Sequence, residues 1–212
     1  MKTFEQMIDG YRNFRAGDWH EERERWAELA EGQSPQVMVI SCSDSRVDPA
    51  QILDVAPGEI FVLRNVAALV PPFETTPGRH GVSAAVEFAV QFLEVKEILV
   101  LGHGLCGGCK AALTQDLHGN DIGEGGFVAH WVDMLDDARE PIAEKFGTDG
   151  REAELAMELE AVKVSLANLM TFPYVADKVE CGELALHGGH FAISDGILRV
   201  LDKDSGEFKP TE

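Results

Sequence analysis

The stretch that most constrains this chain is an apolar run followed directly by reactive side chains. Residues 37–40 read Val-Met-Val-Ile, a length and composition typical of a buried strand. Cys42, Asp44 and Arg46 come directly after it. In an open α/β sheet, functional side chains collect where strands end and loops begin. A thiol, a carboxylate and a guanidinium therefore stand where a reactive site is expected.

A second apolar run, residues 97–101, ends in the same way. It leads into Gly-His-Gly-Leu-Cys-Gly-Gly-Cys over residues 102–109, which include His103 and Cys106. If the two strands are neighbours in one sheet, these two side chains converge with Cys42. Two thiolates and one imidazole are a zinc-binding set, and three protein ligands leave the fourth tetrahedral position to water. The pattern is typical of a catalytic rather than a structural zinc site.

The two motifs together resemble those of the β-class carbonic anhydrases. Cys-x-Asp-x-Arg covers residues 42–46, and His-x-x-Cys-Gly-Gly covers residues 103–108. The resemblance extends from about Gln33 to residues 186–189. It implies an α/β fold with a mostly parallel central sheet flanked by helices and a C-terminal antiparallel edge. It also implies one zinc ion per chain and reversible hydration of carbon dioxide to bicarbonate and a proton, by a zinc-bound hydroxide.

The resemblance implies roles for further residues. Asp44 and Arg46 would form a dyad in which Asp44, held ionised by the guanidinium, orients the attacking oxygen. In some relatives this aspartate binds the metal instead, beside a bicarbonate pocket that includes a tryptophan. Val39 stands at the position of that tryptophan, so we expect Asp44 to stay on Arg46. The residues expected around the substrate are Gln33 (from a partner subunit), Phe61, Val66, Phe88 and Gly104. Many relatives have a tyrosine at the position of Phe88, so its hydroxyl is missing here.

Two other classes of protein would use the same residues. A redox protein would use Cys106 and Cys109 as an exchanging pair, but His103 and the residues around Cys42 would then be unexplained. A structural zinc module would use Cys42, His103, Cys106 and Cys109 as a closed set. Within the family, a hydrolase of carbon disulfide or carbonyl sulfide is the nearest alternative.

Composition limits the partners and the compartment. Eighteen basic and 37 acidic residues give a net charge of −19, which opposes binding to nucleic acid and to anionic membranes. We expect no membrane span, because the apolar runs are shorter than the ~18 residues needed. The first residues lack the pattern of a secretory signal. Four cysteines in 212 residues do not make a disulfide framework, and zinc ligation needs free thiolates, so we expect a cytoplasmic protein.

We predict a single domain over residues 1–212, with residues 1–32 as an N-terminal helical arm. Apolar spacing predicts helices over residues 4–14 and 19–30. Their apolar faces either pack within the chain or, as the resemblance suggests, on a partner subunit in a homodimer or a multiple of dimers. The remaining expected elements are strands at 60–63, 184–186, 191–193 and 197–201, helices at 80–93, 127–143 and 152–170, and a glycine-rich turn at 119–126. We also expect residues 103–106 to turn into a helix on which His103 and Cys106 share a face.

Overall fold

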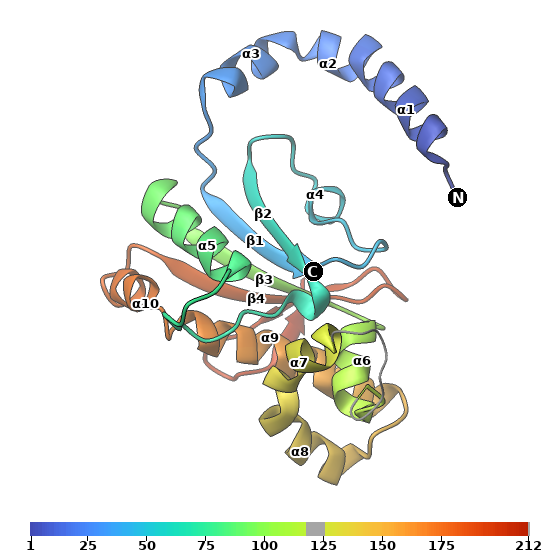
Figure 1. Ribbon diagram of the computed structural model, residues 1–212, viewed down its shortest axis with the longest axis vertical. Coiled ribbons are helices and arrows are strands. Elements are labelled where there is room, and N and C mark those ends of the chain that lie inside the picture. The colour runs from blue at the N-terminus through green and yellow to red at the C-terminus, as the bar shows by residue number, and fades with distance from the viewer. Residues whose placement is uncertain (118–125, 212) are drawn as a thin grey trace. The chain divides into compact units, whose positions relative to one another are not determined.

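The structure is a computed structural model that describes residues 1–117 and 126–211 (Figure 1). Contacts divide the chain into two compact units, Met1–Ser34 and Pro35–Glu212. The expected glycine-rich turn lies outside the described residues, except for Gly126.

The first unit is helical. Its elements are α1 (Phe4–Ala16), α2 (Asp18–Glu21) and α3 (Arg23–Glu31). Thr3 and Gln6 exchange side-chain and backbone hydrogen bonds in a capping box that starts α1. The second predicted helix is in fact two, because the chain leaves helical geometry at Glu22. The rings of Phe14 and Trp26 meet edge-on, with centroids 5.7 Å apart, and so connect α1 with α3.

A six-stranded sheet organises the second unit. In spatial order its strands are β2 (Ile60–Asn65), β1 (Val37–Cys42), β3 (Glu97–His103), β4 (Ala185–Phe191), β5 (Leu198–Leu201) and β6 (Phe208–Pro210). The first four strands are parallel, and β5 and β6 pair antiparallel. The expected mostly parallel sheet with an antiparallel C-terminal edge is confirmed. The strands expected at 184–186 and 191–193 are one strand, because β4 pairs with β3 along its whole length.

Helices flank this sheet. They are α4 (Pro49–Ile52), η1 (Val66–Ala68), α5 (Gly81–Glu87), η2 (Phe88–Phe92), α6 (Gly107–Thr114), α7 (Phe127–Val132), η3 (Asp133–Leu135), α8 (Asp136–Phe146), α9 (Arg151–Leu169) and α10 (Pro173–Glu180). The helix expected over residues 80–93 is α5 followed by the π-helical turn η2. The long helix α9 packs against β3, β4, α6 and α8 (Figure 1).

Two apolar clusters lie between the sheet and the helices. One contains Met38 and Ile40 of β1, and the other contains Cys42 at the end of the same strand. Five of the six residues of β1 are buried. Burial on both faces explains why a parallel strand reads as a continuous apolar run. The second cluster also holds Cys106 and Cys109, so the candidate ligands lie at the edge of a packed core.

Gly102 lies where α9 crosses β3. A Cβ atom there would lie 2.7 Å from Val162 Cγ2, and a β-branched side chain on a helix has little freedom to turn away. We expect Gly102→Ala to lower the free energy of unfolding by about 1–3 kcal/mol, measured by urea denaturation. Gly81→Ala, whose Cβ would meet nothing within 4 Å, is the control and should change it by less than about 0.5 kcal/mol. Equal stability of the two variants would contradict this account of the packing.

Candidate metal centre and active site

The candidate site lies at the carboxyl ends of β1 and β3. These strands are parallel neighbours, with Ser41 opposite Leu101. Cys42 is the last residue of β1 and His103 is the last residue of β3, so the two leave the same edge of the sheet. Cys106 follows as the N-cap residue of α6. The pairing of the two strands thus brings together residues that are distant in the sequence.

The turn between His103 and Cys106 differs from the sequence expectation. His103 still belongs to β3, and α6 begins only at Gly107. Between them Leu105 has a φ of 59°, which reverses the chain. The two side chains therefore converge because a strand end and a sharp turn face each other, and not because they share a helical face.

Cys42, His103 and Cys106 form a compact cluster of ligand atoms. Their sulfur and ring-nitrogen atoms lie within 4.8 Å of one another, and all three residues are buried. Among the residues that the structure describes, it is the one such group of three or more His, Cys, Asp or Glu side chains. Cys109 is not part of it, so the closed set of four that a structural zinc module needs is not formed.

This donor set fits a zinc ion. His103 Nδ1 donates to the Gly104 carbonyl at 2.9 Å, which leaves the lone pair on Nε2. Nε2 is buried and has no hydrogen-bond partner in the described part of the chain. An imidazole oriented by a carbonyl on its other nitrogen is the usual arrangement of a metal ligand.

The raised pKa values of the two thiols also indicate a site for a cation. The hydrogen bond with Cys106, together with burial, raises the pKa of Cys42 to about 12. The hydrogen bond with Cys109 raises the pKa of Cys106 to about 12. Thiols with such pKa values become thiolates at neutral pH only beside a strong positive charge, which a divalent ion among them supplies.

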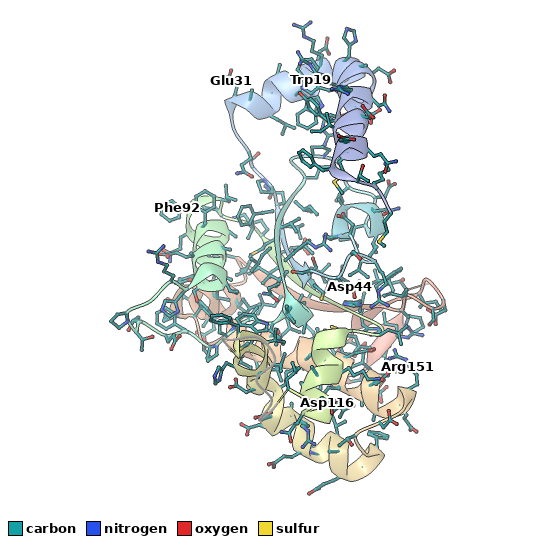
Figure 2. The ribbon with its side chains drawn as sticks, turned by 45° about the vertical axis from the view of Figure 1, so that its right-hand side comes forward. Trp19, Glu31, Asp44, Phe92, Asp116 and Arg151 are labelled. Carbon is teal, nitrogen blue, oxygen red and sulfur yellow. The ribbon has the colours of Figure 1, made fainter. Side chains whose placement is uncertain are left out.

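Arg46 holds the Asp44 carboxylate beside this cluster. Figure 2 labels Asp44. Arg46 Nε donates to Asp44 Oδ1 at 2.9 Å, and Nη2 donates to Oδ2 at 2.6 Å. These hydrogen bonds hold the pKa of Asp44 well below its usual range, so the carboxylate is ionised. Asp44 Oδ2 lies 3.9 Å from His103 Nε2, too far for a hydrogen bond. Asp44 therefore lies at the edge of the ligand cluster and not within it.

The second unit contains four of the residues expected around the substrate, which are Phe61, Val66, Phe88 and Gly104. Val66 lines a depression of about 390 Å³ together with Asn65, Phe127, Val128 and Trp131. Phe61 and Phe88 instead pack on each other, with ring centroids 5.8 Å apart. Gln33 belongs to the first unit. Gly104 donates its N–H to the Phe191 carbonyl at 2.9 Å, so this amide is engaged within the protein while its carbonyl orients His103.

Arg64, which the sequence analysis did not single out, fixes the loop that follows β1. Its Nε donates to the Cys42 carbonyl at 2.9 Å, and its Nη2 donates to the carbonyls of Asp44 and Val47 at 2.7 and 2.8 Å. Nη1 adds an ion pair with Asp48 at 3.2 Å. The signal in the sequence was an arginine directly after the apolar residues of β2, where a solvated charge is unusual.

Arg64→Lys tests this arrangement. A lysine keeps the charge but cannot reach three carbonyls and a carboxylate from one planar group. We expect the free energy of unfolding to fall by about 1–3 kcal/mol, measured by urea denaturation. Arg199→Lys is the control, because Arg199 makes an ion pair with Asp195 at 3.4 Å, and it should cost less than about 1 kcal/mol. If the Arg64 substitution cost no more than its control, the loop would not depend on these bonds.

Comparison with known proteins agrees with this geometry. Residues 37–198 match the family described as carbonic anhydrase. The chain is 32% identical to beta carbonic anhydrase 3 of Arabidopsis thaliana, over 100% of this chain and 80% of that protein. The structure of the β-carbonic anhydrase CcaA has a TM-score of 0.90 and 29% identity, covering 98% of this chain and 92% of that chain. A structure from work on two tetrameric β-carbonic anhydrases of the filamentous ascomycete Sordaria macrospora has a TM-score of 0.82 and 29% identity, covering 99% and 98%. The chain belongs to the β-carbonic anhydrase family.

Proposed function

We propose that this protein is a zinc enzyme that converts carbon dioxide and water reversibly to bicarbonate and a proton. The observation that carries the proposal is the cluster of two thiols and one imidazole beside an ionised carboxylate, in a chain of the β-carbonic anhydrase family.

Cys42, His103 and Cys106 would hold one zinc ion per chain. When bound, zinc supplies a Lewis acid that lowers the pKa of water toward neutrality. The chain brings three ligands to the ion, which is the number typical of catalytic sites. The Gly104 carbonyl fixes the His103 ring, so that Nε2 keeps its lone pair toward the two sulfur atoms.

Asp44 would orient the attacking oxygen. An ionised carboxylate can only accept hydrogen bonds. Oδ1 already accepts two from Arg46, one from the backbone N–H and one from Nε, whereas Oδ2 accepts one from Nη2 and has a lone pair left. An oxygen that still carries a proton would therefore be held by Asp44, with its own lone pair directed at carbon dioxide. Arg46 contributes by preventing the carboxylate from turning toward the ligand cluster. Correct orientation of this kind can supply a large part of a rate enhancement.

The test is the rate of carbon dioxide hydration by stopped flow, with zinc content measured on the same samples. Cys42→Ser and His103→Ala should lose zinc and activity together, and removal of zinc from the wild type with a chelator should abolish the activity. Cys181→Ser, which changes an exposed thiol, should retain both. A His103→Ala protein with one zinc per chain and the full rate would overturn the proposal. Zinc-dependent hydrolysis of carbon disulfide or carbonyl sulfide without carbon dioxide hydration would favour the alternative within the family.

A homodimer, or a multiple of dimers, would be the active unit. Every residue of α1, α2 and α3 is described and none is buried. The exposed apolar residues of α1 are Phe4, Met7, Ile8 and Tyr11. In the second unit, β2 forms one edge of the sheet, and Phe88 and Phe92 are exposed. The Sordaria macrospora relatives are described as tetrameric, which supports assembly here.

Sedimentation velocity at the assay concentration tests the assembly. We expect a dimer or larger species, and we expect Met7→Asp to weaken it by about tenfold or more, because a charge would enter an apolar contact. Glu5→Gln on the same helix is the control and should leave the assembly unchanged. A wild-type monomer with full activity would exclude this proposal.

A cytoplasmic location is also proposed. All four cysteines are free, which supports a reducing compartment. In the described part of the chain, none of the helices is long and apolar enough to cross a membrane. The net charge of −19 supports small-molecule substrates rather than nucleic acid as partners.

A further inference from the structure

Glu158 is a buried carboxylate that the chemistry above does not use. It lies in α9 and is only 1% exposed. The neighbouring buried residues of α9 are small or apolar and include Met157, Ala161 and Val162. An ionised carboxylate is costly to bury unless it is fully paired. Its position inside the protein therefore needs an explanation.

Four N–H groups surround this carboxylate. Oε1 accepts hydrogen bonds from the Leu105 backbone N–H and from Arg151 Nη1, both at 2.7 Å. Oε2 accepts from Arg151 Nη2 at 2.8 Å and from His190 Nε2 at 3.0 Å (Figure 2 labels Arg151). A carboxylate offers about four lone pairs, so its capacity is used. Burial alone would raise the pKa of Glu158, but the bonds from His190 and Arg151 outweigh burial and lower it.

Leu105 is the partner that belongs to the candidate metal-binding loop. It stands between His103 and Cys106 with a φ of 59°, a region that leucine rarely adopts. Its side chain is 45% exposed, so burial of that side chain does not hold the conformation. Two backbone hydrogen bonds do, because the N–H donates to Glu158 and the carbonyl accepts from Arg46 Nη2 at 2.9 Å.

These two bonds connect Glu158 to the dyad. The Arg46 nitrogen that donates to the Leu105 carbonyl also donates to Asp44 Oδ2. Without a partner for its N–H, Leu105 would relax toward an ordinary φ and turn its carbonyl away from Arg46. We propose that Glu158 is a positioning residue, which holds Leu105 and thereby the metal-binding loop and the Asp44–Arg46 pair, with Arg151 and His190 fixing its carboxylate. The expected effect on the reaction rate rests on the proposed function, whereas the effect on metal geometry does not.

Two conservative variants distinguish the effect of side-chain length at position 158 from the effect of its charge. Glu158→Gln loses the charge but keeps an oxygen at the distance needed to accept from the Leu105 N–H. Glu158→Asp keeps the charge but is one methylene shorter, so it cannot reach Leu105 from α9. The half-exposed Arg151 side chain can follow the shorter carboxylate, whereas the Leu105 backbone cannot.

We expect kcat/KM for carbon dioxide hydration, per bound zinc, to stay within about threefold of wild type in Glu158→Gln. It should fall by about tenfold or more in Glu158→Asp, since a misplacement of ~1 Å can cost a hundredfold in rate. Glu154→Gln is the matched control and should not change the rate. Glu154 lies one turn earlier in α9 and pairs with Lys110 at 2.9 Å and Arg151 at 3.8 Å. A Glu158→Asp protein as active as Glu158→Gln, or more active, would overturn the proposal.

The absorption spectrum of the cobalt(II)-substituted protein gives a second readout that needs no catalysis. Ligand-field bands report the arrangement of the two sulfurs and the imidazole. We expect the spectra of Glu158→Gln and Glu154→Gln to match that of the wild type, and the spectrum of Glu158→Asp to differ. If the wild type did not hydrate carbon dioxide, the proposed function would fail while these spectra still tested the positioning. A wild-type spectrum in Glu158→Asp would contradict the positioning even in an active enzyme.

Discussion

The parallel pairing of β1 with β3 is the constraint on which the rest of the site depends. It places Cys42 and His103 at the same edge of the sheet, although they are distant in the sequence. A slip of one residue would turn every side chain of the strand to the opposite face of the sheet. Residues 38–42 of β1 are all buried, so such a slip is costly, because every apolar side chain of the strand would change its surroundings. The register of β1 against β3 thus determines whether Cys42 and His103 can meet at the site.

The sheet brings the candidate ligands near one another, and hydrogen bonds from and to charged side chains fix the loops that carry them. Arg64 fixes the backbone of the loop after β1, and Arg46 fixes the carboxylate of Asp44. Glu158 fixes the turn after β3 through Leu105. These bonds lie where regular secondary structure ends and backbone groups have lost their partners in the sheet. The net charge of the chain is −19, yet two arginines, Arg46 and Arg64, lie at this end of the sheet. Their role is to fix the conformation of the loops there.

The sequence predicted the type of sheet and the convergence of Cys42, His103 and Cys106, because both follow from apolar strands that end in reactive residues. It did not predict the left-handed turn at Leu105, since a leucine gives no signal for a positive φ. The strands expected at 184–186 and 191–193 are one strand, and a Cβ at Gly188, which lies between them, would be 3.0 Å from Leu166 and Val162. Glycine is needed there for close packing and not for a turn. Glu158 was one acidic residue among many, because the partners that make it distinctive come from three separate segments.

The decisive measurement is an experimental structure of the zinc-loaded protein at neutral pH. We expect one zinc ion bound by Cys42 Sγ, His103 Nε2 and Cys106 Sγ, with the Asp44 carboxylate still on Arg46 and the fourth position not supplied by the chain. Binding of zinc by the Asp44 carboxylate, or by Cys109 as a fourth protein ligand, would contradict this expectation.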